Sequence, residues 1–382
     1  MSGKKCPKSQ AKEFYMKKIA LIALAVILLT GTILVSCGPG AEGNELPGDE
    51  KWAFVADTSW YSDGPAAFDI NTPEELAGLA KLVNNGNNFQ GKTLTQIAVL
   101  DLAGKLWTPI GTESNSFKGT FIGKNITGLT ITGSVNYQGL FGIIVDGEVE
   151  GVKLTDISIS GGVYVGGVAG YNGAGAMVKN CSVTGSVTGI GGIGGVVGIN
   201  FGEVTGCSAK DVSVEGGGGV GGVVGTNQGK VSASYSTGSV KGKDNIVGGI
   251  VGNNHSAVFT LSGCYSTCAV TGSASLVGGI VGSINSGNVT NCVALNTSIS
   301  GASPGRVAGS PGTLANNYGR SDMPGTWNLN DTDMVDGADV DADDYNDQAW
   351  WKTAFPNGPG FDFGISGAWA WGDNDLPKLK WE

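Results

Sequence analysis

The sequence contains little charge and a single histidine among its 382 residues. Charged residues make up 15% of the chain and the net charge is −10, so nucleic acid and anionic membrane surfaces are unfavourable partners. A zinc site of the His–Glu–x–x–His type needs two histidines, and a Ser–His–Asp triad would have to use His255. We interpret His255 as an exposed turn residue.

Carboxylates are scarce in the middle of the chain. Residues 160–310 contain only Glu203, Asp211, Glu215 and Asp244, which do not share one position of the repeat described below. Enzymes that cleave polysaccharides need clustered carboxylates. We therefore predict that the protein is not an enzyme, with a polysaccharide lyase or hydrolase as the alternative.

Proline is also scarce, with 12 residues, whereas glycine contributes 67. Glycine does not fall at every third position, which excludes a collagen triple helix. The hydrophobic content of 41% and the sparse charge argue against intrinsic disorder.

A glycine-rich hexapeptide recurs along the sequence. VGGIVG occurs at 247–252 and 277–282, and related copies occur at 165–170, 193–198 and 220–225. The steps between copies are 28, 27, 27 and 30 residues, and the similar segments YQGLFG (137–142) and PGRVAG (304–309) extend the series. A fixed period of this length is typical of a solenoid, in which each repeat stacks on its neighbours.

Each repeat has the pattern of strands and turns. In 220–246, an apolar strand over 220–225 is followed by a turn at Asn227 and Gly229, and then by a stretch that alternates small and apolar residues with period two. A repeat of this length buries its apolar face only by stacking. We predict an all-β fold, a single-stranded right-handed parallel β-helix of about eight or nine coils.

Two positions of the repeat conserve their residue type from copy to copy, as asparagine and as a small residue. The asparagines are predicted to occupy left-handed turn positions and to bond to their stacked copies, with Asn285 as the counterpart in the copy at 277. The small residues are predicted to face inward, most of them as thiols that act as small hydrophobes; metal binding and disulfides remain alternatives. These predicted structural ladders are Asn172, Asn200, Asn227 and Asn254, and Cys181, Cys207, Ser234, Cys264 and Cys292.

These repeats resemble the GLUG repeat of bacterial surface proteins, in which a GG(I/L/V)VG run is followed by Asn and Gly. Residues 68–93 and 100–123 are similar to the N-terminal cap of those proteins, and LPKL at 376–379 is similar to their ending. The resemblance implies a surface or adhesin-like role.

Both ends of the solenoid are predicted to be capped, because open strand edges aggregate. Thr72, Pro73 and Glu75 form a capping-box pattern that begins an amphipathic helix over 73–84. The aromatic C-terminal cap is interpreted as a hydrophobic plug, with a sugar-stacking platform as the alternative. The tryptophans of this cap are Trp350, Trp351, Trp369, Trp371 and Trp381.

The stretch 331–347 is rich in aspartate, whose oxygens suit calcium, but its spacing does not follow a calcium-binding loop. We predict a solvated acidic loop and no cofactor, with calcium as the alternative. The candidate calcium ligands are Asp331, Asp333, Asp336, Asp339, Asp341 and Asp343.

The N-terminal segment predicts export. Lys17 and Lys18 precede an apolar run over 19–35, which is typical of a secretory signal, with a transmembrane helix as the alternative. LVSC at 34–37 resembles the lipobox of bacterial lipoproteins, which implies cleavage before Cys37 and lipidation of Cys37. Gly38 then leaves transit to an outer membrane open.

We therefore predict a non-enzymatic surface protein for adhesion, ligand display or scaffolding, whose partners are the membrane and a surface protein or glycan. A glycan-binding or glycan-processing β-helix is the alternative. The predicted segments are a signal peptide (1–36, with 1–15 a start-site artefact), a lipidated tether (37–55), an N-terminal cap with the first coils (56–123), GLUG-type repeats (124–318), and an acidic loop with a Trp-rich cap (319–382).

Overall fold

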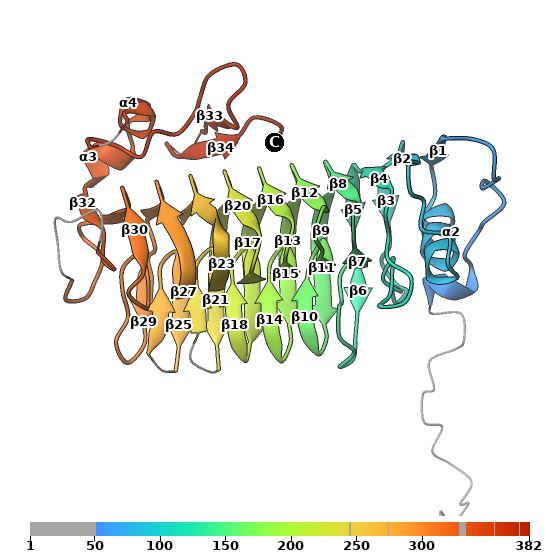
Figure 1. Cartoon of the computed structure of the whole chain (residues 1–382), viewed down its shortest axis with the longest axis horizontal. Helices are drawn as coiled ribbons and strands as arrows, with labels where there is room; N and C mark the ends of the chain where they lie inside the picture. The colour runs from blue at the N-terminus through green and yellow to red at the C-terminus, as the bar shows by residue number, and fades with distance from the viewer. Residues whose placement is uncertain (1–50, 244–245, 274, 328–333, 355, 374) are drawn as a thin grey trace, which may run out of the picture. The chain divides into compact units, whose positions relative to one another are not determined.

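The computed structural model describes residues 51–382 except 244–245, 274, 328–333, 355 and 374, and it omits the side chains of 257–259. It confirms a parallel β-helix, a stack of about nine coils in which every coil pairs with the next (Figure 1). Cys37 and the predicted signal segment lie outside the described residues. Among the described residues, no helix is both long and apolar enough to span a membrane.

The coils contribute strands to three parallel sheets, and an antiparallel hairpin follows them. The first sheet contains β1 (Ala67–Ile70), β2 (Thr93–Gln96), β4 (Thr120–Ile122), β7 (Phe141–Ile144), β8 (Glu148–Glu150), β11 (Ala169–Asn172), β12 (Met177–Lys179), β15 (Val197–Asn200), β16 (Glu203–Thr205), β19 (Val224–Asn227), β20 (Lys230–Ser232), β23 (Val251–Ser262), β27 (Val281–Thr290) and β30 (Thr313–Ala315). The second contains β10 (Val163–Gly166), β14 (Gly191–Gly194), β18 (Gly218–Gly221), β22 (Ile246–Gly248) and β26 (Leu276–Gly278). The third contains β3 (Leu100–Asp101), β5 (Asn125–Thr127), β6 (Thr130–Ile131), β9 (Lys153–Ser160), β13 (Ser182–Thr188), β17 (Ser208–Gly216), β21 (Tyr235–Gly242), β24 (Tyr265–Ser266), β25 (Ala269–Gly272), β28 (Val293–Ala294), β29 (Ser298–Ser300), β31 (Tyr318–Arg320) and β32 (Ala338–Val340). The hairpin is β33 (Trp369–Trp371) and β34 (Pro377–Leu379), and the helices are η1 (Trp52–Phe54), α2 (Pro73–Asn84), α3 (Ala342–Tyr345) and α4 (Gln348–Lys352).

The repeated hexapeptide forms a corner and not the single strand expected from sequence. In the copy at 220–225, β18 ends at Gly221 and β19 begins at Val224. A Cβ atom built on Gly222 would lie 2.0 Å from the carbonyl oxygen of Gly249 in the next coil, where no side chain fits. The glycine pair is therefore repeated because each corner touches the backbone of the corner above it.

A second corner of each coil has a left-handed backbone immediately before the ladder of small residues. In one coil this residue is Ala233, whose φ is +46°. The left-handed residue interrupts the expected alternation of inward and outward side chains, so Ser234 faces the core and Tyr235 belongs to a cluster outside it. Glycine and asparagine suit this conformation, and they occupy most of the series. The series with positive φ is Gly151, Asn180, Gly206, Ala233, Gly263, Asn291 and Asn316.

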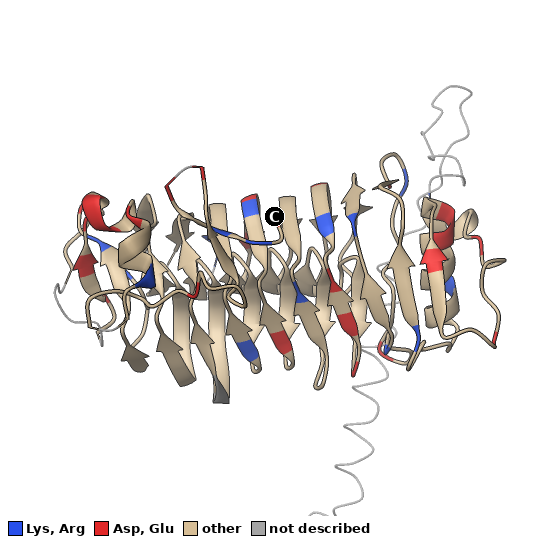
Figure 2. Cartoon of the chain, turned by 90° about the horizontal axis from the view of Figure 1, so that it is seen from above, with Lys and Arg blue, Asp and Glu red and all other residues tan. Residues whose placement is uncertain are grey.

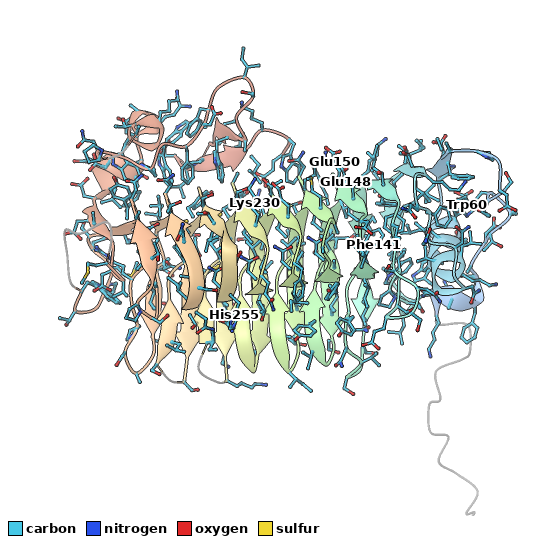
Figure 3. All side chains as sticks on the ribbon, in the orientation of Figure 1. Trp60, Phe141, Glu148, Glu150, Lys230 and His255 are labelled. Atoms are coloured by element: carbon cyan, nitrogen blue, oxygen red, sulfur yellow. The ribbon has the colours of Figure 1, made fainter. Side chains whose placement is uncertain are left out.

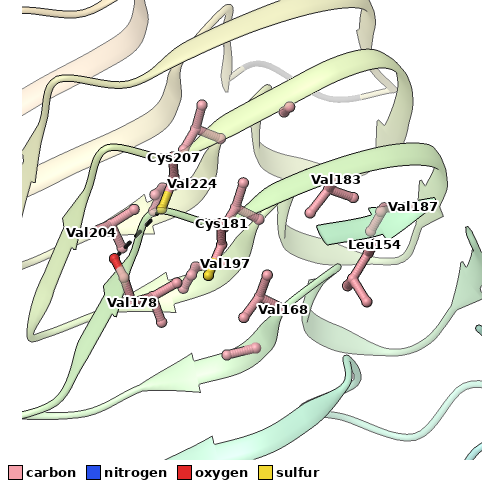
Figure 4. Close-up of a cluster of buried hydrophobic side chains, with 14 of the residues drawn as sticks. Leu154, Val168, Val178, Cys181, Val183, Val187, Val197, Val204, Cys207 and Val224 are labelled. Carbon is pink, nitrogen blue, oxygen red and sulfur yellow. Dashed lines mark hydrogen bonds between the residues drawn. The ribbon is translucent and has the colours of Figure 1, made fainter. Parts of the chain in front are cut away.

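The core between the sheets is a set of stacked aliphatic side chains and thiols (Figure 4). All five described cysteines are buried and free, and the Cys207 thiol donates to the Val178 carbonyl at 3.5 Å. Burial raises the pKa of Cys181 and Cys264 well above the usual range and that of Cys268 to about 11. Such thiols stay protonated and behave as small hydrophobic groups.

The asparagine ladder is buried and its members bond to one another, but it differs from the expectation in two respects. Asn172, Asn200 and Asn227 each donate from Nδ2 to the Oδ1 of the next asparagine at 2.8 Å. None of the four asparagines has a positive φ, because they lie in strands, with Asn254 inside β23, and the left-handed corners lie elsewhere. Asn254 pairs with Ile284 and not with Asn285, so an isoleucine ends the ladder.

The predicted N-terminal helix is confirmed as α2. Thr72 accepts from the backbone N–H of Glu75 at 3.2 Å, and the Glu75 carboxylate accepts from the backbone N–H of Thr72 at 3.3 Å, which completes a capping box. Leu76, Leu79 and Val83 are fully buried against the first coils. The helix thus covers the apolar interior at this end of the stack.

Near the opposite end of the core, Arg306 is buried, and the tryptophans of the C-terminal segment belong to a separate cluster. Arg306 replaces the second glycine of the hexapeptide in the last copy, and its side chain is fully buried. It donates to the backbone carbonyls of Asp336 and Gly337 at 2.8 Å and to the carboxylate of Asp339 at 2.6 Å. The segment that stacks on this corner, residues 335–337, is not a copy of the hexapeptide, and its carbonyls accept from the Arg306 side chain.

Candidate functional site

The tryptophan-rich segment lies along the flank of the coils, which corrects the prediction of an end plug (Figure 1). Its side chains cover a ladder of tyrosines on the outer surface of the third sheet. Tyr235 and Tyr265 are parallel at 5.0 Å, and the Trp369 ring lies 5.7 Å from that of Tyr265. Trp351 and Trp369 are 0% and 2% exposed, so they are not available to stack on a sugar.

The other tryptophans of this segment also contact the chain itself. Trp350 packs edge-on against Tyr318 at 5.1 Å, Trp371 packs against the tyrosine-covering cluster, and Trp381 donates from its indole N–H to the Gly206 carbonyl at 2.9 Å. Extended backbone supplies further partners, because the Tyr265 hydroxyl donates to the Pro377 carbonyl at 2.6 Å. These tryptophans therefore fasten the segment to the coils.

The aspartate stretch does not converge on a calcium site. Asp336 and Asp339 both bind Arg306, and Asp341 accepts the Asp344 N–H at the start of α3. Asp343 lies exposed within α3, while Asp331 and Asp333 lie outside the described residues. Across the described ranges, no three His, Cys, Asp or Glu side chains gather closely enough to hold a metal ion.

His255 is exposed, as expected, but it lies within the strand β23 and not in a turn. Its Nε2 is 2.8 Å from the amide nitrogen of Asn285. Figure 3 shows it near the opposite edge of the coils from Glu148, Glu150 and Lys230. Charged groups are few along the coils (Figure 2), and several pair across them, as Lys179 does with Glu148 at 2.6 Å.

A second aromatic ladder, on the N-terminal half of the stack, is left uncovered by the described residues. We call it the aromatic strip: Tyr137, Tyr164, Tyr171 and Phe201, all half-buried. The rings of Tyr137 and Tyr164 are stacked at 5.6 Å, Tyr171 meets Tyr137 edge-on at 6.0 Å, and Phe201 lies 5.3 Å from Tyr171. The strip therefore crosses three successive coils as one continuous surface.

Two of these tyrosines have a backbone conformation that favours glycine. Tyr137 and Tyr164 have φ values of +57° and +63°, and the stacked positions of the next two coils are Gly192 and Gly219, at +65° and +68°. A bulky side chain with a left-handed backbone costs of order 1–3 kcal/mol, and such strain gathers at functional sites. A Cβ atom built on Gly192 would lie 2.5 Å from Cδ1 of the Tyr164 ring, so the ring occupies the space that a side chain at 192 would need.

A pocket of about 470 Å³ opens beside Tyr137. Its apolar walls are formed by Pro109, Val135 and the Tyr137 ring, and its polar groups come from Glu113, Ser114, Asn136 and Gln138. Burial, and then the nearby carboxylate of Glu113, raise the pKa of Tyr137, which keeps its hydroxyl protonated. The volume is within the range of small-ligand sites.

The pocket is lined by the Gln138 amide, whose oxygen is reached by solvent. Gln138 is 8% exposed and donates from Nε2 to the Asn136 carbonyl at 2.8 Å, but none of the described residues donates to its Oε1. The Glu113 carboxylate lies beside the Tyr137 hydroxyl and makes no ion pair with a described residue. Val135, which also lines the pocket, is 70% exposed.

The sequence does not reveal this site because the repeats are offset by one residue here. Aligning YQGLFG with VGGVAG placed Tyr137 opposite Val165, an inward position, whereas the structure pairs Gln138 with Val165. Tyr137 therefore occupies the left-handed position outside the core. A comparison of residue 164 with Gly192 and Gly219 one repeat and two repeats later would have shown that an aromatic side chain replaces glycine.

Comparisons with known proteins agree with the architecture. Residues 161–188 match the GLUG motif, so the chain contains the motif that its repeats resemble. A search of curated proteins found no match. The chain is similar to a crystal structure described as a "putative immunoglobulin A1 protease from Bacteroides ovatus", at 17% identity and a TM-score of 0.58, covering 87% of this chain and 97% of that one. At this identity the similarity shows a shared fold.

Proposed function

We propose that this protein is an exported, lipid-anchored and non-enzymatic binding protein, in which the stacked coils display the aromatic strip to a ligand outside the cell. The observation that carries the proposal is the contrast between the two aromatic ladders. The C-terminal segment covers Tyr235, Tyr265 and Tyr318, while the described chain leaves Tyr137, Tyr164, Tyr171 and Phe201 open. Exposed apolar surface of this kind is typical of an interaction site.

The described residues around the strip favour binding over catalysis. Glu113 is the single carboxylate that lines the pocket, whereas hydrolysis of a glycosidic bond needs two carboxyl groups on either side of the bond. His255 contacts Asn285 and is not among the residues that line the pocket. Adhesion or ligand display thus needs only the surface that the described residues provide.

The lipid anchor rests on the sequence of 34–37, and it has its own test. Cys37→Ser should leave unprocessed precursor that no longer incorporates labelled palmitate. Protease treatment of intact cells should digest the wild-type protein if it lies on the surface. Normal lipid labelling of Cys37→Ser, or full protection from protease, would contradict this part of the proposal.

A further inference from the structure

We infer that the aromatic strip and its pocket bind a neutral oligosaccharide chain, an assignment that rests on the proposed function and names the ligand of the same site. A sugar has an apolar face that packs on aromatic rings and a rim of hydroxyl groups that needs hydrogen-bond partners. The pocket offers both: the Tyr137 ring on one wall, and Glu113, Ser114 and Gln138 among its lining residues.

The free acceptor of Gln138 points to a hydroxyl-bearing ligand. Its amide is held in place by the bond to Asn136, so Oε1 is fixed without a donor among the described residues. This oxygen is not fully buried, so water reaches it in the free protein and a ligand hydroxyl can take the place of that water. An apolar peptide side chain has no donor for it, whereas every sugar unit carries hydroxyl groups.

The direction of the strip fits a linear chain. Tyr137, Tyr171 and Phe201 lie in three successive coils at 6.0 and 5.3 Å from one another, and Tyr164 widens the surface beside Tyr137 at 5.6 Å, so neighbouring sugar units find aromatic contacts along the stack. Charge selects the sugar type, because the carboxylate of Glu113 is the charged group in the pocket and the whole chain carries a net charge of −10. Both repel uronic and sialic acids, which leaves neutral sugars.

The unfavourable backbone of the two tyrosines supports a functional role. The coils that follow have glycine at the same position, so the fold itself does not need an aromatic ring there. Replacing Tyr137 or Tyr164 by glycine should relieve strain and leave the fold intact, while it removes the binding rings. A residue kept for stability would show the opposite behaviour.

The experiment uses residues 38–382, the mature chain without its lipidated Cys37, in affinity electrophoresis and calorimetry. The probes are soluble neutral polysaccharides (β-glucan, mannan, galactan and xylan), with polygalacturonate and heparin as anionic probes. We expect at least one neutral polysaccharide to bind, and Tyr137→Gly and Tyr164→Gly to weaken binding at least tenfold with an unchanged or raised melting temperature. Gln138→Ala should weaken it too. Phe54→Ala, which removes an aromatic ring exposed by 67% outside the strip, should leave binding unchanged.

Each of the other outcomes would overturn either the sugar site or the proposed non-enzymatic binding function. Binding of the anionic probes alone, of no probe, or of neutral probes equally well by the glycine variants overturns the sugar site. If the glycine variants lose binding to a panel of unglycosylated surface proteins and not to polysaccharides, the sugar assignment fails and the proposed binding function stands. Cleavage of a bound polysaccharide, detected by chromatography of the products, would overturn the non-enzymatic function and leave the sugar site in place.

Discussion

Replacing Gly222 by alanine tests the idea that the repeated hexapeptide is a backbone contact between coils. The new Cβ atom would lie 2.0 Å from the Gly249 carbonyl oxygen and 2.8 Å from the Ser236 side chain. Since real Cβ contacts stay beyond 3.0 Å, the next corner must move by about 1 Å. That movement stretches the 3.1 Å hydrogen bond from the Gly222 N–H to the Gly249 carbonyl.

The expected loss of stability combines two terms. Overpacking of a rigid contact costs about 1–3 kcal/mol. A weakened buried hydrogen bond adds about 1 kcal/mol. The free energy of unfolding should therefore fall by about 3 kcal/mol, measured by urea denaturation and circular dichroism.

The same coil offers a matched control. Gly218 lies four residues earlier, and a Cβ atom there meets no heavy atom within 4 Å and no left-handed backbone. Gly218→Ala should therefore change the unfolding free energy by less than about 1 kcal/mol, and reduced freedom of the unfolded chain favours a small gain. Equal urea midpoints for the two variants would refute the contact between corners.

Three further predictions concern the buried ladders. Asn200→Ala removes the amide hydrogen bonds to Asn172 and Asn227 and should lower the free energy of unfolding by about 3 kcal/mol, measured by urea denaturation. The control Asn253→Ala changes a half-buried side chain and should lower it by less than about 1 kcal/mol. Similar losses for the two variants would contradict a buried amide ladder. Cys207→Asp buries an unpaired charge and should lower the unfolding free energy by several kcal/mol, against about 1–2 kcal/mol for Cys207→Ala, and equal melting temperatures would show that position 207 is not inward. Burial, and then the charge of Glu382, raise the pKa of Tyr265 in the folded protein. The contribution of this hydroxyl to stability is therefore complete below the unfolded pKa of about 10 and is lost as the pH rises above that value. Tyr265→Phe should flatten the fall of the urea midpoint at alkaline pH, and an unchanged slope would argue against a buried hydroxyl.

The sequence alone determined the architecture of the coils. The hexapeptide recurs with a nearly constant step because a solenoid repeats by translation, and Thr72 with Glu75 marks the start of α2 through interactions within one turn. Both signals are local or strictly periodic, so they can be read without knowledge of the fold. The inward position of the cysteine ladder follows from the same periodicity, whereas the asparagines were expected at left-handed turns and are buried in strands.

Tertiary structure decided which aromatic and charged groups are covered. Trp351 and Trp369 pack on tyrosines more than 80 residues away in the sequence, and Asp339 pairs with Arg306, so neither set remains free for a ligand. The register of one coil on the next decided the rest, because a shift of one residue moves Tyr137 from the core position to the surface. Contacts between distant segments and single-residue offsets leave no periodic signal, and the candidate site depends on both.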